Sequence, residues 1–158
     1  MAKEVKTNAM RILDRMKIDY RHYTYECSEF EDGMQTVRIL QLDSRQVYKT
    51  LVTESPAKEY FVFVIPVEQE LDLKKAARTV GQKSLEMIHV KDITKVTGYV
   101  RGGCTSVGMK KNYRTVIDAS AQKLQTMIVS GGRIGSQIEL VPWDLAKAAN
   151  AEFASVTA

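Results

Sequence analysis

Two glycine pairs are the residues of this chain whose spacing points most directly to ligand binding. Gly102 and Gly103 lie in the stretch GYVRGGCTSVGMKK, residues 98–111, and a second pair, Gly131-Gly132, follows Ser130. Glycine has no Cβ, so backbone N–H groups at such positions can approach a ligand oxygen closely, as an oxyanion or phosphate site requires. The alternative is a tight turn or bulge between strands, which on residue types alone is the more common outcome.

The first glycine pair does not belong to a nucleotide-binding P-loop. Gly103 and Gly108 have the required four-residue gap, but Met109 stands where a P-loop needs lysine and Lys110 where it needs serine or threonine. Without that hydroxyl the motif has no ligand for a magnesium ion. The sequence therefore disfavours a P-loop nucleotide protein.

Lys49 is a candidate for charge stabilisation. It interrupts the apolar, β-forming segment VYKTLV and is followed by Thr50. A lysine on a half-buried strand usually points to solvent. If its face lines a pocket instead, the ammonium would be a fixed positive charge for a phosphate or a developing oxyanion.

The sequence shows no recognisable protein nucleophile or metal site. Ser130 lacks a partnered base, because the two histidines, His22 and His89, lie in unrelated segments. No sequence feature lowers the pKa of Cys104, and Cys27 is an even weaker candidate nucleophile. Both are therefore expected to be small hydrophobic residues. Two cysteines are too few for a disulfide scaffold or a four-ligand zinc site.

The charge balance is compatible with a polyanionic partner. The formal net charge is +4 and the isoelectric point is about 9.0. Basic residues gather in and near the glycine-rich segments and could follow a nucleic-acid backbone, although most such runs are solvated faces: Arg101, Lys110, Lys111, Arg114 and Arg133.

The elements that must position these residues are those of one folded domain. The chain has 158 residues, of which 44% are hydrophobic and 27% are charged, close to the globular average. We therefore expect a single domain over residues 1–158. The longest apolar run, residues 60–67, is far shorter than a membrane span, and the first residues lack the apolar region of a signal peptide, so the cytoplasm is expected.

Hydrophobic periodicity predicts an irregular mixture of helices and strands. One helix is expected in the N-terminal segment, where apolar residues recur at helical spacing from Val5 to Met16 and Thr7 is available as the N-cap. Further helices are expected over residues 34–40, 73–80, 93–96 and 142–153, the last opened by Pro142. Strands are expected over residues 20–25, 47–52, 60–66, 85–90, 115–118, 126–130 and 137–141. This pattern indicates an α+β domain with a mixed, curved sheet.

Several of these segments, in order, resemble the YbaK/EbsC family of aminoacyl-tRNA deacylases, which is related to the editing domain inserted in bacterial prolyl-tRNA synthetases. The resemblance spans nearly the whole chain and is carried by VYKTLV, LDLKKAA, TGYVRGGCTSVGMKK, VSGGRIG and PWDLAKA. It implies a curved, barrel-like sheet surrounded by helices. It also implies hydrolysis of misacylated tRNA in trans, with Cys-tRNA(Pro) as the first candidate substrate.

The resemblance assigns roles to individual residues. In this family the substrate's cysteine is thought to attack its own ester and leave as a thiolactone, so neither a protein nucleophile nor a cofactor or metal is implied. The catalytic residues would be Lys49, which matches the family lysine, and Gly102 and Gly103, whose N–H groups would stabilise the oxyanion. The substrate-binding residues would be Tyr25, Phe30, Thr50, Ser130 and Gly131. The tRNA acceptor stem would meet Arg101, Lys110 and Lys111.

The chain also departs from the family pattern. Relatives commonly read GGxSPxG, whereas Ser106 is followed here by Val107, so the proline that would stiffen the loop is absent. Gln41 replaces a usual glycine. These changes bear on loop geometry and amino-acid preference more than on reaction class.

Two other functions remain open at this point. One is a deacylase for alanine or another small amino acid, because a single methylene changes selectivity only about 10- to 200-fold. The other is a module that binds aminoacyl-tRNA without cleaving it. The family further suggests prolyl-tRNA synthetase as a partner, and the sequence does not fix the oligomeric state.

Overall fold

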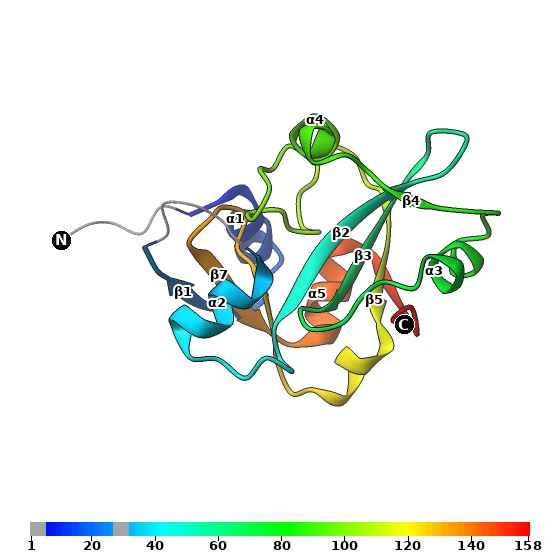
Figure 1. Cartoon of the computed structure of the whole chain (residues 1–158). Coiled ribbons are helices and arrows are strands. Elements are labelled where there is room, and N and C mark those ends of the chain that lie inside the picture. Colours follow the sequence, from blue (N-terminus) through cyan, green and yellow to red (C-terminus); the bar gives the residue numbers. More distant parts are fainter. Residues whose placement is uncertain (1–5, 27–31) are drawn as a thin grey trace.

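Two β-sheets form the centre of the fold in the computed structural model, which describes residues 6–26 and 32–158 (Figure 1). The antiparallel sheet has the strand order β1-β7-β6, and the mixed sheet has the order β4-β2-β3-β5-β8. The strands are β1 (Arg21–Thr24), β2 (Tyr48–Glu54), β3 (Tyr60–Pro66), β4 (Glu86–Met87), β5 (Arg114–Asp118), β6 (Met127–Ser130), β7 (Ser136–Leu140) and β8 (Ala151–Ala154).

The described helices surround these sheets. They are α1 (Asn8–Arg15), α2 (Gly33–Leu40), α3 (Leu73–Thr79), α4 (Ile93–Thr97) and α5 (Pro142–Ala149), with the 3₁₀ turns η1 (Val90–Asp92) and η2 (Ala119–Lys123). The Thr7 side chain accepts a hydrogen bond from the Met10 N–H at 3.2 Å, which confirms the predicted N-cap of α1. Pro142 opens α5 as predicted. No helix of residues 6–26 and 32–158 is long and apolar enough to cross a membrane.

The expected α+β class is confirmed, but the strands do not close into a barrel. Among the described residues, the two sheets meet through a parallel bridge between Val47 and Ile128 at the start of β2. At the other end of β2, Thr53 and Glu54 pair with β4. The edge of β2 between these two contacts has no neighbouring strand in the described structure, so the sheet stays open there.

Two strand and helix predictions differ from the structure. The closing helix was expected to reach Phe153, but it ends at Ala149, because Asn150 adopts a left-handed conformation with φ of 53°. The following residues form β8, which pairs in parallel with β5. The strand expected over residues 85–90 is reduced to Glu86 and Met87.

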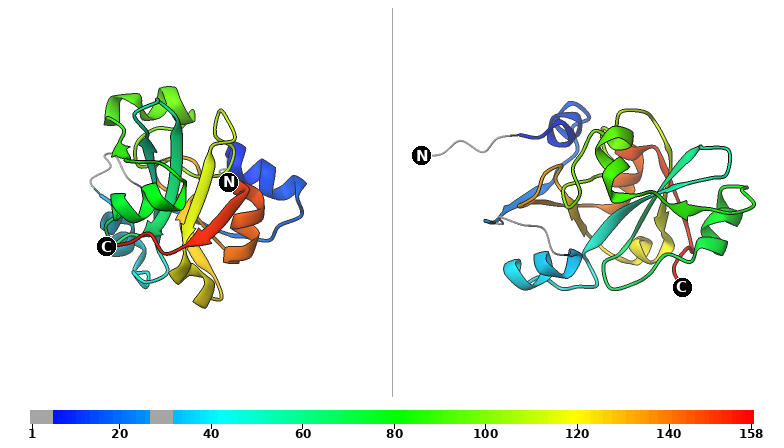
Figure 2. Two further views of the ribbon diagram at one scale, coloured as in Figure 1. Left: turned by 90° about the vertical axis from the view of Figure 1, so that its right-hand side faces the viewer. Right: turned by 45° about the horizontal axis from the view of Figure 1, so that its top comes forward.

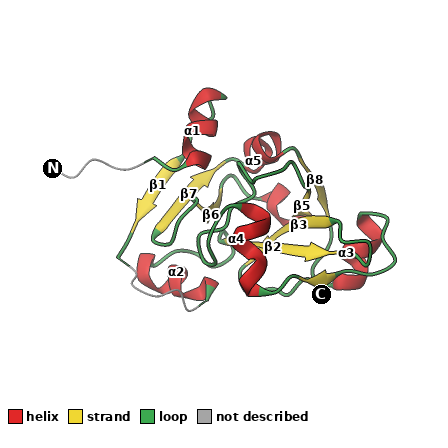
Figure 3. Cartoon of the chain, turned by 90° about the horizontal axis from the view of Figure 1, so that it is seen from above, coloured by secondary structure: helices red, strands yellow, loops and turns green. Residues whose placement is uncertain are grey.

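The apolar run of β3 is buried on both of its faces. On one face Val64 joins a core cluster with residues of α1 and α5, which lie next to each other in the left view of Figure 2. On the other face Phe63 and Ile65 pack against Ala76 and Ala77 of α3. Seen from above, α4 lies over β2 and β3 (Figure 3), and its Val96 packs against both strands. A strand covered on two sides explains why its sequence does not alternate.

A buried carboxylate ties the end of β5 to the C-terminal segment. Asp118 accepts hydrogen bonds from the Ser120 N–H at 3.2 Å, the Ser120 hydroxyl at 2.6 Å and the Val156 N–H at 3.0 Å. The hydroxyl of Ser120 also lies 2.7 Å from the hydroxyl of Tyr48 in β2. Asp118 therefore links β5 to the last residues of the chain directly and to β2 through Ser120.

We predict that Asp118→Ala lowers the free energy of unfolding by about 1–3 kcal/mol, because it leaves the buried Val156 N–H without an acceptor. Urea denaturation followed by circular dichroism measures this loss. Asp19→Ala, at an exposed position, is the matched control and should change stability by less than about 0.5 kcal/mol. Equal effects of the two variants would contradict the assigned role.

Candidate functional site

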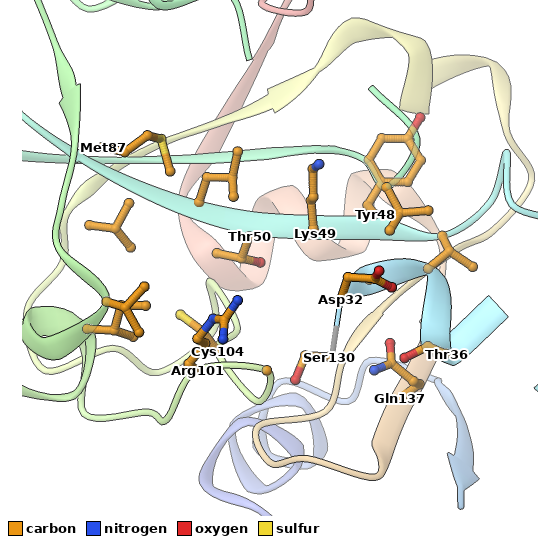
Figure 4. Close-up of a pocket in the computed structure, with 18 of the residues that line it drawn as sticks. Asp32, Thr36, Tyr48, Lys49, Thr50, Met87, Arg101, Cys104, Ser130 and Gln137 are labelled. Carbon is orange, nitrogen blue, oxygen red and sulfur yellow. The ribbon is translucent and has the colours of Figure 1, made fainter. Parts of the chain in front are cut away.

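A cavity of about 420 Å³ lies along the open edge of β2 (Figure 4). Residues 47–52 form one wall. The remaining wall residues come from α2 and its cap, the residue after β3, the 87–93 segment, the first glycine loop, and strands β6 and β7: Asp32, Gly33, Thr36, Val67, Met87, Ile88, Val90, Ile93, Arg101, Gly102, Cys104, Ser130 and Gln137.

The backbone of β2 presents polar groups to this cavity. Val52 accepts a hydrogen bond from the Ile88 N–H at 3.1 Å, on the side of β2 that faces away from β3. Successive residues of a strand turn their backbone groups to alternate edges. The N–H and C=O groups of Thr50 therefore also face away from β3, in the stretch where no described strand pairs with β2. A ligand in the cavity can use them as a donor and an acceptor.

Lys49 and Thr50 both line the cavity, although their side chains point to opposite faces of β2 (Figure 4). This is possible because the cavity opens at the edge of the strand rather than on one face. Partial burial lowers the pKa of the Lys49 ammonium, and the negative charge of Glu70 opposes that shift. The structure thus places the two residues of the KT pair together at the candidate site.

The two residues of the first glycine pair have different surroundings. Gly102 lines the cavity and has φ of +85°. The Gly103 N–H donates to the Val100 carbonyl at 3.0 Å, so this amide is engaged in a turn. The expectation that both amides are free for an oxyanion is therefore wrong for Gly103, and Gly102 remains the candidate donor.

Gly103 instead allows two loops to touch through their backbones. A Cβ at this position would lie 2.6 Å from the Cα of Arg133 and 2.9 Å from the Ile134 nitrogen. Real Cβ atoms essentially never approach backbone this closely. The first glycine loop is thus packed directly on the loop that follows Ser130.

The loop that follows Ser130 is held by hydrogen bonds between its own residues. Ser130 lines the cavity, and its hydroxyl accepts a hydrogen bond from the Gly132 N–H at 3.1 Å. The Gly131 N–H donates to the Ser136 carbonyl at 2.9 Å, and a Cβ on Gly131 would lie 2.4 Å from the Ser136 hydroxyl. Gly131 therefore supports the wall of the cavity without being part of its lining.

Tyr25 does not line the cavity but contacts a residue that does. Its hydroxyl is 2.9 Å from the hydroxyl of Thr36, which is buried and lines the cavity. Sequence reasoning missed Thr36, Asp32 and Gln137, because only the packing of α2 and β7 around the edge of β2 brings them to the site. Phe30 lies outside the described residues.

The predicted tRNA-binding residues fall in two places. Arg101 lines the main cavity, whereas Lys110 and Lys111 line a second cavity of about 250 Å³. This second cavity lies between the 106–113 segment, Ile12 of α1 and the end of α5. The three predicted tRNA-binding cations therefore do not line one cavity.

The candidate nucleophiles of the described chain are poorly suited to attack a substrate. Burial raises the pKa of the Cys104 thiol to about 11, so the thiol is protonated at neutral pH. His22 lies 2.8 Å from the Ser136 hydroxyl, but Ser136 is fully buried behind Gly131. Among residues 6–26 and 32–158, no group of three or more His, Cys, Asp or Glu side chains could hold a metal ion.

Comparison with known proteins gives this geometry a family context. The family described as the aminoacyl-tRNA editing domain matches residues 27–148. The chain is 42% identical over 153 residues to an Enterococcus faecalis protein named as a candidate Cys-tRNA(Pro)/Cys-tRNA(Cys) deacylase, EbsC, and the match covers 96% of this chain and 93% of that protein.

Solved structures share the fold. The chain superposes on a hypothetical protein, APE2540, with a TM-score of 0.85 and 20% identity, covering 94% of this chain and 97% of that one. It superposes on a candidate trans-editing enzyme for prolyl-tRNA synthetase with a TM-score of 0.79 and 18% identity, covering 98% and 99%. At these identities the superpositions establish the architecture alone.

We predict that Gly103→Ala lowers the free energy of unfolding by about 2–3 kcal/mol, because the new methyl group overlaps backbone atoms that cannot move independently. The control is Gly81→Ala, where the added Cβ meets nothing within 4 Å and only the positive φ of 71° is unfavourable. That variant should lose about 1 kcal/mol. Urea titrations of both variants decide the point, and equal losses would show that the loop contact tolerates a side chain.

The Cys104 thiol predicts a stability change at high pH. The folded protein keeps this thiol protonated up to about pH 11, whereas the unfolded chain ionises it near 9.0. Rising pH therefore favours the unfolded state between these values and has no such effect below them. Because the thiol is partly exposed to the cavity, we expect wild type to lose about 2 kcal/mol more than Cys104→Ser between pH 9 and 11. Parallel stability curves for the two proteins would refute this.

Proposed function

The chain belongs to the aminoacyl-tRNA editing domain family, and on this basis we propose that it is a trans-editing deacylase that removes cysteine from tRNA for proline. The observation that carries the proposal is the cavity at the edge of β2, which both Lys49 and Gly102 line. The name of the Enterococcus faecalis relative supports cysteine as the first amino acid to test.

The proposed reaction uses a nucleophile from the substrate. The thiol sulfur of the esterified cysteine attacks its own carbonyl carbon, and the bond from that carbon to the ribose oxygen breaks. The thiol proton ends on the ribose oxygen, so cysteine leaves as a thiolactone that water then opens. This route fits a cavity whose own thiol, Cys104, is held protonated by burial.

The protein's part is to hold the ester and to stabilise charge. The carbonyl oxygen becomes negative as sulfur attacks, and the N–H of Gly102 with the ammonium of Lys49 would stabilise that oxygen. The hydroxyl of Ser130 and the backbone of Thr50 would orient the aminoacyl group. Tyr25 would act through Thr36, whose hydroxyl it contacts.

The tRNA would extend from this cavity over basic residues. Arg101 would meet the phosphates nearest the ester, and Lys110 and Lys111 would meet the acceptor stem farther away. Such contacts carry little base specificity, so prolyl-tRNA synthetase is the expected partner that supplies the correct tRNA. An aminoacyl-tRNA substrate would locate this activity in the cytoplasm.

We predict that the wild-type protein cleaves Cys-tRNA(Pro) faster than the uncatalysed rate and spares Pro-tRNA(Pro). Loss of the cavity cation in Lys49→Ala should lower kcat/KM by about 100- to 1,000-fold, the effect of removing one oxyanion donor. The measurement is a deacylation time course with Cys-tRNA(Pro), Ala-tRNA(Pro) and Pro-tRNA(Pro), with and without added prolyl-tRNA synthetase.

The control is Lys83→Ala, which removes the same charge at an exposed position outside the cavity. It should retain wild-type activity. Preferential cleavage of Ala-tRNA(Pro) would contradict the thiolactone route, because alanine has no thiol. If no ester is cleaved even with synthetase, the protein is a binding module rather than an enzyme.

A further inference from the structure

The lining of the main cavity contains a single carboxylate among the described residues. The side chains there that carry charge at neutral pH are Lys49, Arg101 and Asp32. Cys104 adds no negative charge, because burial raises its pKa to about 11. The described lining of the cavity thus combines two cations with one anion.

Asp32 is held in place while half of its carboxylate stays available. Its Oδ1 accepts a hydrogen bond from the Gln35 N–H at 3.0 Å, which makes Asp32 the N-cap of α2. Arg38 is 3.7 Å from the same oxygen. Within the described residues Oδ2 has no partner, and the side chain is 64% exposed. The cap fixes the direction of the carboxylate, and its second oxygen can accept from a ligand.

The position of Asp32 relates it to the reacting part of the cavity. In Figure 4 it lies on the same side as Thr36 and Gln137, with Ser130 next to them, whereas Met87 lies at the opposite end. The polar side of the cavity therefore carries the acid, and the other end is apolar.

We infer that Asp32 binds the α-ammonium group of the aminoacyl ester and so restricts the site to esters with a free amino group. This inference rests on the proposed function. A cysteinyl ester carries one cation, its α-ammonium, and the described lining offers it one anion. The ammonium is bonded to the carbon next to the ester carbonyl, so holding it also fixes where the carbonyl lies relative to Gly102. Esters whose amino group is acylated, as in peptidyl-tRNA, lose this contact and are spared.

The test compares two esters of the same tRNA. Cysteinyl-tRNA carries the ammonium, and 3-mercaptopropionyl-tRNA keeps the ester and the thiol but lacks the amino group. Wild type should prefer the cysteinyl ester, and Asp32→Asn should reduce the ratio of the two kcat/KM values about tenfold, the size expected for one charge-assisted hydrogen bond at a partly exposed site. Dividing the ratio for wild type by that for the variant cancels the intrinsic reactivity of the two esters.

Two controls separate recognition from folding. Asparagine is as good an N-cap as aspartate, so Asp32→Asn should retain α2 and have the same melting temperature as wild type. Asp43→Asn removes the same charge from an exposed aspartate that pairs with Arg45 outside the cavity. It should leave the ester preference unchanged.

A binding measurement keeps the inference independent of turnover. Calorimetry with adenosine carrying an amide-linked cysteinyl group, and with its 3-mercaptopropionyl counterpart, should show the same preference and the same loss in Asp32→Asn. An unchanged preference in Asp32→Asn, or none in wild type, overturns the role of Asp32 while deacylation still supports the proposed function. Preferential binding without any ester cleavage supports Asp32 and rejects the proposed function.

Discussion

The direct backbone contact between Gly103 and Arg133 is the constraint on which the site depends. It joins two segments that are about thirty residues apart in the chain, and both line the cavity, the first with Arg101, Gly102 and Cys104 and the second with Ser130. Backbone atoms that touch have no rotamers to change, so this contact fixes the relative position of the two loops more firmly than a side-chain contact could. The glycines of this chain thus act partly as packing residues, in addition to any contact with a ligand.

The open edge of β2 is the second structural condition for the site. If β4 continued along β2, or if β6 extended its bridge beyond Val47, strand pairing would occupy the backbone groups of Thr50 and close the cavity. The edge is instead covered by the side chains of α2, the 87–93 segment and the glycine loops. An exposed edge of this kind would invite association with other strands, and enclosing it in a cavity both protects the edge and makes its donors and acceptors available to a ligand.

Local patterns in the sequence predicted much of this arrangement, and tertiary packing explains what they missed. Thr7 and Pro142 mark helix starts through local geometry, so their roles could be read from neighbouring residues. The apolar run of residues 60–66 likewise predicted a strand, and β3 forms there. In contrast, the pattern of α5 did not show that Asn150 would adopt a left-handed conformation and release β8 to pair with β5. The sequence placed Asp32 before the helix predicted over residues 34–40 and Thr36 within it, and it assigned neither to the site, because their place in the cavity depends on where α2 packs.

The groups that line the described cavity favour catalysis by positioning the substrate rather than by a reactive side chain of the protein. The Cys104 thiol is protonated at neutral pH, and the serine that contacts a histidine, Ser136, is buried away from the cavity. The described lining therefore provides charges, hydroxyls and backbone groups rather than an activated nucleophile. In such a site the attacking group must come from the substrate or from water, and its rate depends on how closely the ester is held to the attacking atom. Selectivity then follows from the same contacts, because a substrate that is not held at both its charged amino group and its carbonyl does not reach the reactive geometry.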